Sequence, residues 1–222
     1  MATRPIFIPR PDEGPLVKEM LVEFHWHPGM AVSQKQKSVR SLHAAARIKG
    51  IYPVLEVSTK ADSPLGKKLS SFNLIFRSDS WGELTVESAY QGSKVFEHGG
   101  PYTDLLSQTG YTIKKDERLI TSGKLIAFNF ENITWGLEPK TAFYDWLYLN
   151  ALHMQTELNT DIKTYTGFTD IEFNPQKSIN CQARSCALYV ALAQRGKIKG
   201  LLSNREAFIE VIKTEYLDYM QW

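Results

Sequence analysis

Side chains that can do chemistry are concentrated in one short stretch, Leu84–Phe96, which reads LTVESAYQGSKVF. If this stretch is a helix, its reactive side chains fall at positions i, i+3, i+4 and i+7 of one face: Glu87, Tyr90, Gln91 and Lys94. A carboxylate on such a face can stabilise positive charge at a reacting carbon, or it can orient a water molecule as a general base. The alternative is an exposed amphipathic helix whose Glu–Lys pair contributes little energy.

The residues that flank this stretch also favour a helix. Thr85 is a suitable N-cap, and it places Glu87 in the first turn, where the positive end of the helix dipole favours an ionised carboxylate. Gly99, Gly100 and Pro101 are predicted to end the helix. The sequence therefore predicts that one helix carries both Glu87 and Lys94.

The segment TVESAYQGSKVF resembles the T-x-E-x-x-[YF]-Q-x-x-K-x-F signature helix of the NADAR family, whose members act on NAD-derived and ADP-ribose-type compounds. Further matching stretches follow in the expected order, so the resemblance covers about Leu69–Arg195. It points to the NADAR branch that serves as antitoxin beside DarT-type ADP-ribosyltransferase toxins. The resemblance implies the NADAR (YbiA-like) fold, an α+β fold in which helices surround a small mixed sheet.

Two of these stretches supply substrate-binding residues by resemblance. Phe72 and Asn73 resemble the pair that NADAR proteins place before the signature helix, so Phe72 would face a base or ribose and Asn73 would hydrogen-bond to it. Trp135 resembles a family tryptophan that follows the signature helix, and it would stack on adenine or guanine. The alternative for Trp135 is a small hydrophobic cluster. Tyr90 would line the same site, and Gln91 would bind hydroxyl or phosphate groups.

Two later stretches resemble the remaining parts of the family's pocket. The segment FTDIEF at 168–173 resembles the segment that delivers an acidic residue, although the usual W-G is missing; Asp170 is favoured over Glu172. The segment INCQARSCALYVAL resembles a family helix start, with Asn180 in the asparagine position. Asn180 would help to hold a diphosphate at the helix start, or it is an ordinary N-cap. The catalytic candidates are therefore Glu87, Lys94 and Asp170.

The rest of the chain predicts an irregular mixture of strands and helices. Residues 1–15 contain four prolines and are predicted to form an extended arm, with weak order at the very start. Alternating or apolar runs predict strands at 17–27, 52–58, 74–77, 124–130 and 168–173. Helical spacing predicts helices at 33–49, 84–96, 141–153, 157–165, 178–194 and from a capping box at 203–206 to 219. Because no strand–helix unit repeats, an α+β fold fits better than a doubly wound sheet.

Length and composition allow a sizeable core, since 43% of the 222 residues are hydrophobic. We expect residues 1–68 to form an N-terminal strand–helix–strand extension packed on the core, 69–196 the NADAR catalytic core, and 197–222 a C-terminal helix. Cys181 and Cys186 lie five apart on one predicted helix. This spacing suits neither a disulfide nor a zinc site, so they are predicted to be buried thiols.

The pattern of ligand residues and apolar runs predicts no metal, no cofactor and no membrane partner. His25 and His27 lie two apart in a predicted strand, but no third metal ligand follows at a recognisable spacing. No run approaches the roughly 18 to 20 apolar residues of a membrane helix, and the first residues lack the apolar region of a signal peptide. We expect a cytoplasmic protein.

A formal net charge of +2 and a pI near 8.4 are too mild to indicate nucleic-acid binding by bulk charge. A local patch is present on the helix predicted at 33–49, which carries five basic residues: Lys35, Lys37, Arg40, Arg47 and Lys49. They form either a solvated helix face or a contact with DNA phosphates.

The resemblance implies an N-glycosidic ADP-ribosyl hydrolase that removes ADP-ribose from guanine bases in DNA and so reverses the modification made by a DarT-type toxin. Two alternatives remain open. One is a non-catalytic ADP-ribose-binding module, which would not need Glu87. The other is an N-glycosidase that acts on a small nucleotide or a riboflavin-pathway intermediate. The sequence also leaves open whether Glu87 or Lys94 is the nucleophile.

Overall fold

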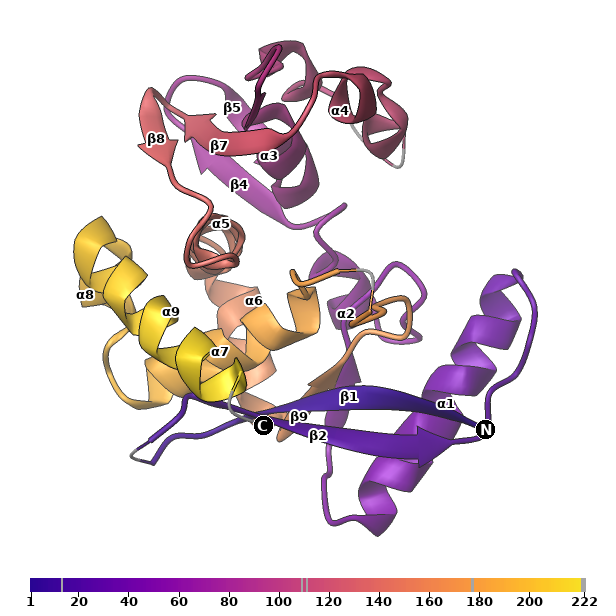
Figure 1. Cartoon of the computed structure of the whole chain (residues 1–222). Helices are drawn as coiled ribbons and strands as arrows, with labels where there is room; N and C mark the ends of the chain where they lie inside the picture. The colour runs from indigo at the N-terminus through magenta and orange to yellow at the C-terminus, as the bar shows by residue number, and fades with distance from the viewer. Residues whose placement is uncertain (13, 109, 111, 177, 221–222) are drawn as a thin grey trace. The chain divides into compact units, whose positions relative to one another are not determined.

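The computed structural model describes residues 1–12, 14–108, 110, 112–176 and 178–220 (Figure 1). Within them the chain forms two compact units, each assembled from two separate segments. The first unit comprises Met1–Ser70 and Thr156–Ser203, and the second comprises Ser71–Gln155 and the chain from Asn204 onwards. Helices and small sheets occur in both units, which confirms the α+β class. The consecutive division at residues 68 and 196 stays a prediction.

The first unit contains a mixed sheet in the strand order β2-β1-β9-β3. Its strands are β1 (Ala2–Pro9), β2 (Val17–Phe24), β3 (Val54–Glu56) and β9 (Gly167–Thr169). β1 pairs antiparallel with β2 along its whole length and with β9 at Phe7, whereas β3 runs parallel to β9. Around this sheet the unit has the helices α1 (Val32–Ile48), α2 (Pro64–Lys68), α6 (Thr156–Asp161), η3 (Ile162–Thr164), α7 (Gln182–Gln194) and α8 (Ile198–Leu202).

The extended conformation predicted for residues 1–15 is confirmed, since β1 occupies most of that segment. The weak order predicted at its very start is wrong, because β1 begins at Ala2 and buries Ile6 and Phe7. The prolines are tolerated since β9 pairs with β1 only at Phe7, and most of that edge of β1 therefore has no ladder partner that would need an N–H. Pairing with β2 and the burial of Ile6 and Phe7 outweigh the proline signal here.

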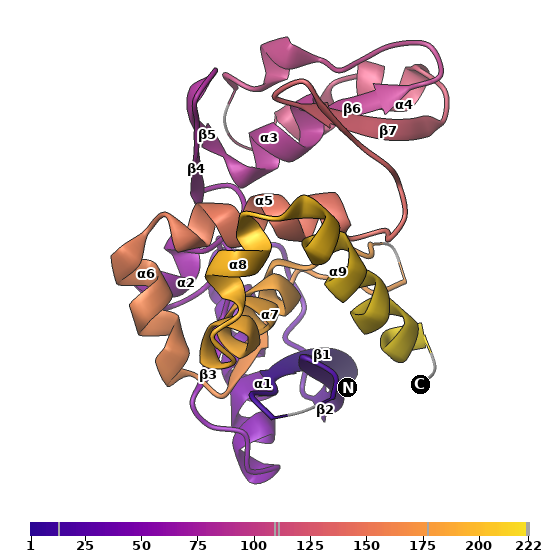
Figure 2. The ribbon, with the colours of Figure 1, turned by 90° about the vertical axis from the view of Figure 1, so that its left-hand side faces the viewer.

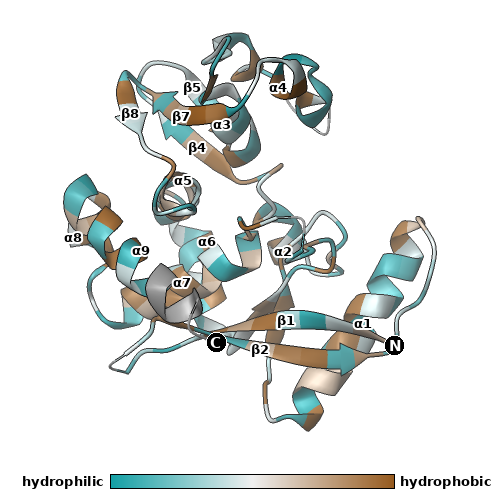
Figure 3. Ribbon diagram, viewed as in Figure 1, coloured by the Kyte–Doolittle hydropathy of each residue, from teal (hydrophilic) through white to brown (hydrophobic). Residues whose placement is uncertain are grey.

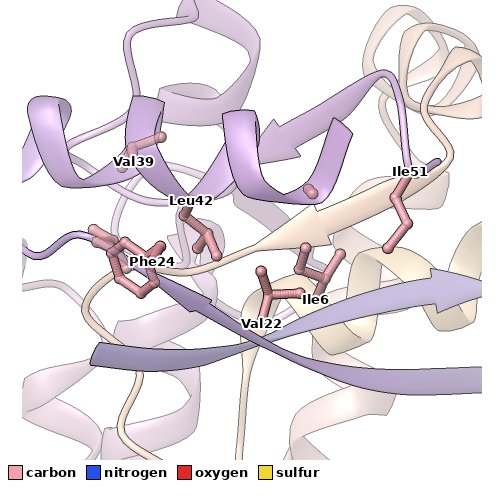
Figure 4. Close-up of a cluster of buried hydrophobic side chains, with 8 residues drawn as sticks. Ile6, Val22, Phe24, Val39, Leu42 and Ile51 are labelled. Atoms are coloured by element: carbon pink, nitrogen blue, oxygen red, sulfur yellow. The ribbon is translucent and has the colours of Figure 1, made fainter. Parts of the chain in front are cut away.

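Helix α1 packs its apolar stripe on the β1–β2 hairpin. Val39, Leu42 and Ala46 recur at helical spacing and are buried against Val22 and Phe24 of β2 (Figure 4). Hydrophilic and hydrophobic bands alternate along α1 when the ribbon is coloured by hydropathy (Figure 3). The helix predicted at 33–49 is thus confirmed within one residue.

The second unit has two small sheets with the strand orders β4-β5 and β6-β7-β8. Its elements are β4 (Ile75–Ser78), β5 (Gly82–Thr85), α3 (Val86–Gly92), β6 (Lys94–Phe96), η1 (Thr103–Leu105), η2 (Ile113–Lys115), α4 (Arg118–Thr121), β7 (Leu125–Phe130), β8 (Ile133–Trp135), α5 (Ala142–His153) and α9 (Arg205–Met220). Figure 2 shows α3 beside the β4–β5 hairpin. The described residues therefore form three small sheets in all, and not the single sheet expected.

The stretch Leu84–Phe96 is not one helix, as predicted, but strand, helix and strand. α3 ends at Gly92, and Lys94 belongs to β6, where it pairs with Phe128 of β7. The Ser93 carbonyl accepts a hydrogen bond from the Asn129 N–H at 2.7 Å, so the backbone already joins the sheet at the helix C-cap. Pairing with a strand more than thirty residues away overrides the local helical spacing.

Three other boundaries differ from the predictions. α7 begins at Gln182 and not at residue 178, and α9 is capped by Asn204, whose Oδ1 accepts a hydrogen bond from the Ala207 N–H at 3.0 Å, rather than by a serine. The strand predicted at 168–173 ends at Thr169, which leaves Asp170 in the following turn.

Both cysteines are buried free thiols, as predicted, and burial raises the pKa of the Cys181 thiol. Among the described residues, no helix is both long and apolar enough to cross a membrane. The same residues contain no group of three side chains of the kinds that bind metals.

Gly66 in α2 packs so closely on β3 that no side chain fits. A Cβ at this position would lie 2.0 Å from the Glu56 carbonyl oxygen. We predict that Gly66→Ala lowers the free energy of unfolding by about 2 kcal/mol or more, because the overlap outweighs the helix propensity of alanine. Urea unfolding followed by circular dichroism measures this.

Gly200 in α8 is the matched control, since a Cβ there meets nothing within 4 Å. Gly200→Ala is expected to raise the free energy of unfolding by about 0.5–1 kcal/mol. Equal stability of the two variants would contradict the close packing of α2 on β3.

Candidate functional site

Glu87 lies buried in the first turn of α3. The Thr85 hydroxyl accepts a hydrogen bond from the Ser88 N–H at 3.0 Å, so Thr85 is the predicted N-cap. Glu87 is only 3% exposed, and Gln91, one turn later, is 6% exposed. The interpretation of this segment as an exposed amphipathic helix is therefore wrong.

Three side chains hold the Glu87 carboxylate in place. Ser71 donates to Oε2 at 3.1 Å, and Gln91 donates to Oε1 at 2.8 Å. Lys114 of η2 places its Nζ 3.3 Å from Oε1. The backbone adds a further link, because the Glu87 N–H donates to the Ser71 carbonyl at 2.9 Å. The carboxylate is thereby oriented by donors from three separate segments of the second unit.

Lys94 approaches the same carboxylate from β6 rather than from α3. Gly100 fixes the backbone there: its φ is +87°, and a Cβ would lie 2.2 Å from the Lys94 carbonyl oxygen. The Lys94 Nζ lies 5.1 Å from the centroid of the Tyr90 ring. Burial lowers the pKa of Lys94, the negative charge of Glu87 opposes this, and the positive charge of Lys114 lowers the pKa further.

The aromatic candidates divide between this cluster and the core. Phe72 lies under Lys114, whose Nζ is 4.8 Å from the ring centroid. Trp135 is 3% exposed and packs against Trp146, with ring centroids 5.1 Å apart. This packing matches the hydrophobic-cluster alternative for Trp135, and stacking on a base stays a prediction. Asn73 is exposed beside Phe72.

Asp170 belongs to the first unit and is buried, whereas Glu172 is exposed. Gln182 Nε2 donates to its Oδ2 at 2.9 Å, and the Glu172 N–H donates to its Oδ1 at 3.0 Å. Burial, the largest cause, raises the pKa of Asp170 to about 6. Of the two acids, the structure therefore singles out Asp170 as the one held in a protein interior.

A second buried carboxyl, Glu56 of β3, lies beside Asp170. Its oxygens accept hydrogen bonds from the Ser58 hydroxyl at 2.7 Å, the Thr169 hydroxyl at 2.7 Å and the Ile171 N–H at 2.8 Å. Burial and then the charge of Asp170 raise the pKa of Glu56 to about 8. Two carboxyls that resist ionisation together hold a proton near neutral pH.

His43 of α1 extends this network towards the helix. Its Nε2 lies 2.9 Å from the Thr169 hydroxyl oxygen, and the same hydroxyl donates to Glu56. Burial lowers the pKa of His43 to about 4, against the opposing charge of Asp62. His43 is therefore neutral near pH 7 and donates its Nε2 proton to Thr169.

Asn180 directly precedes α7 and is partly buried. The N-cap is Cys181, without a side-chain cap bond, so the interpretation of Asn180 as the N-cap is wrong by one residue. Its proposed role at a diphosphate stays a prediction.

The candidate residues and the side chains around them thus form two clusters, and the residues of each cluster belong to a single unit. The Glu87 cluster of the second unit contains Ser71, Phe72, Glu87, Tyr90, Gln91, Lys94 and Lys114. The Asp170 cluster of the first unit contains His43, Glu56, Ser58, Thr169, Asp170 and Gln182.

Sequence reasoning missed Lys114 and Glu56. Lys114 lies in a polar segment with no pattern that would separate it from its neighbour Lys115. Glu56 did carry a signal, because it is a lone acid in the apolar run VLEV, and acids in buried strands need partners.

Comparison with protein families agrees with the resemblance. A family model described as DarT1-associated NADAR antitoxin matches residues 2–221. The chain belongs to this family. The match extends well beyond the segment Leu69–Arg195 on which the resemblance rested, and it includes β1, α1 and α9. No curated protein matches the chain.

The arrangement of charges in this NADAR antitoxin family member predicts opposite effects of two substitutions on Lys94. Lys114→Gln removes a positive neighbour and should raise the pKa of Lys94, whereas Glu87→Gln removes the negative neighbour and should lower it. The pH dependence of Lys94 acetylation, followed by mass spectrometry, measures both shifts. Lys115→Gln is the control, and equal midpoints in all variants would contradict the cluster.

The buried His43 predicts a pH-dependent loss of stability. Between pH 6.5 and about 4 the unfolded chain binds a proton at His43 and the folded chain does not, so acidification through this window lowers the free energy of unfolding, by up to about 3 kcal/mol. His43→Gln keeps an N–H donor for Thr169 and should lose less stability over the same window.

Glu56 and Asp170 act with the opposite sign, because their raised pKa values favour the folded state at low pH. They are present in both proteins, so the comparison isolates His43. His25→Gln, at an exposed position, is the control. Parallel stability curves for wild type and His43→Gln would show that His43 is not buried neutral.

Proposed function

We propose that the chain is an ADP-ribosyl hydrolase that removes ADP-ribose from guanine bases in DNA and thereby acts as the antitoxin of a DarT-type toxin. The family description, a DarT1-associated NADAR antitoxin, supports the pairing with such a toxin. The observation that carries the chemical proposal is the Glu87 carboxylate, which is 3% exposed and held by Ser71, Gln91 and Lys114. A carboxylate is rarely buried in this way without a role or a strong structural partner.

The reaction requires stabilisation of positive charge at a sugar carbon. When the N-glycosidic bond to guanine breaks, the electron pair leaves with the base and the anomeric carbon becomes oxocarbenium-like. Glu87 stabilises or traps this carbon, or it takes a proton from the water that attacks it. Water then supplies the hydroxyl of free ADP-ribose and the proton that guanine gains.

Lys94 has two roles that fit its surroundings. Burial lowers the pKa of its ammonium group, so a larger share of the amine is neutral and able to attack the aldehyde carbon of an opened ribose. In its charged form it pairs with a phosphate of the substrate. The first role requires Lys94 next to the reacting sugar, and the second requires it next to the diphosphate.

Asp170 is the proposed second acid or base, since a pKa of about 6 leaves part of it protonated near neutral pH and able to donate to a leaving base. The remaining residues bind substrate: Phe72, Tyr90 and Trp135 by ring contacts, and Asn73, Gln91 and Asn180 by hydrogen bonds. The buried position of Trp135 makes it the least direct of these contacts.

Two rival functions make different demands on the Glu87 cluster. A non-catalytic ADP-ribose-binding module needs rings and amides but no buried carboxylate. An N-glycosidase for small nucleotides needs Glu87 but no contact with DNA.

We predict that the wild-type protein releases free ADP-ribose from a guanine-ADP-ribosylated oligonucleotide and that Glu87→Gln lowers the rate by at least about 100-fold. Glu83→Gln is the control, because Glu83 is exposed and pairs with an exposed arginine, Arg77. Calorimetric binding of ADP-ribose separates the rivals. Binding without release by the wild type would establish the binding module, and release from guanosine nucleotides alone would establish the small-molecule enzyme.

A further inference from the structure

The outward face of α1 carries a basic stripe, in which three of five exposed positions are basic. The exposed positions on this face follow each other at spacings of four and three residues, as one helix face requires: Ser33, Lys37, Arg40, Ala44 and Arg47. The 17 residues of α1 include no aspartate or glutamate. Lys49, exposed at the C-cap, continues the stripe.

The fold determines that this face points outward. The opposite face of α1 is buried on the hairpin through Val39, Leu42 and Ala46 (Figure 4). Val22 and Phe24 of β2 point towards α1, so Glu23 between them projects from the other face of the strand. The acids of β2 therefore do not neutralise the stripe.

One acid does face the stripe. Asp62 accepts two hydrogen bonds from Arg40, at 2.8 and 3.2 Å, in an exposed pair. Such a pair contributes little energy, and Arg40 is 65% exposed. Lys37 and Arg47 on either side form no ion pair that the described residues reveal. They carry the uncompensated charge of the stripe.

Two further cations widen the basic surface at the first turn of the helix. Lys35 Nζ lies 4.9 Å from the centroid of the Trp26 ring, and the guanidinium of Arg4 lies 5.4 Å from it. The tryptophan thereby holds both charges beside the amino-terminal end of α1.

The inner side of the same helix contacts the segment that carries Asp170. His43 bonds to Thr169, the residue directly before Asp170, and Glu56 bonds to Thr169 and Ile171 on either side of it. A ligand on the outer face of α1 thus lies one helix diameter, about 10 Å, from the segment that carries the acid proposed to act on the substrate.

We propose that the outward face of α1, defined by Lys37, Arg40, Arg47 and Lys49, binds the phosphate backbone of DNA. From Lys37 to Arg47 the face spans about 15 Å, enough to meet several phosphates of one strand. An anionic membrane fits less well, because membrane-bound helices bury a broad apolar face in lipid. The apolar stripe of α1 is buried in the core, and its exposed apolar residues, Val32 and Ile48, lie at opposite ends of the helix. The choice of DNA over other polyanions rests on the proposed function.

The test is binding of an unmodified, fluorescently labelled oligonucleotide, measured by anisotropy at several salt concentrations. For Lys37→Glu/Arg47→Glu we expect at least a 10-fold weaker affinity at low salt and a salt slope smaller by about 1.5, since each phosphate contact contributes about 0.7–0.9. Lys37→Gln/Arg47→Gln should show a smaller effect in the same direction.

Lys163→Glu/Lys199→Glu is the matched control, since it makes the same change in net charge at exposed positions of the same unit outside α1. Equal weakening by the control would overturn the proposal in favour of bulk charge. Unchanged binding by the α1 variant, or no binding of the oligonucleotide by the wild type, would also overturn it. Circular dichroism confirms that each variant is folded.

The reaction itself separates this proposal from the proposed function. The α1 variant should release ADP-ribose more slowly from an ADP-ribosylated oligonucleotide and at the wild-type rate from ADP-ribosylated deoxyguanosine. A protein that binds the oligonucleotide through α1 but releases no ADP-ribose from either substrate would contradict the proposed function and leave the surface established.

Discussion

The second unit depends on the burial of one carboxylate. A carboxylate that is 3% exposed is tolerated only if donors replace the water it has lost, and Glu87 obtains them from Ser71, Gln91 and Lys114. These donors come from the segment before β4, from α3 itself and from η2. Hydrogen bonding to Glu87 therefore brings together elements that are separate in the sequence. It also brings Lys114 of η2 close enough to lower the pKa of Lys94.

In the first unit, two buried carboxyls are accommodated by protonation rather than by neighbouring cations. Glu56 and Asp170 are both buried, and their pKa values are raised to about 8 and about 6. Hydroxyl and backbone donors hold them, and no basic side chain is bonded to Glu56 in the described contacts. Burial without a cation leaves these carboxyls partly protonated, which fits the role of proton donor proposed for Asp170.

Sequence patterns determined the parts of this protein that depend on neighbours along the chain. The Thr85 cap, the place of Glu87 in a first turn, the length of α1 and the core helix α5 all follow from residues within a few positions of one another. The signature segment was enough to indicate the NADAR family, although the segment folds as strand, helix and strand. A family motif specifies which residues occur in which order. It does not determine the secondary structure of the segment that contains them.

Tertiary structure alone decided what depends on distant partners. Lys94 lies in a strand because β7 pairs with it, and β1 is ordered because β2 covers its length. The burial of Asp170 beside Glu56, the exposure of Glu172, and the contact of Lys114 with Glu87 follow from packing and contacts across up to 115 positions of sequence. Local periodicity carries no information about such contacts, because hydrogen bonding and desolvation depend on which segments the fold places together.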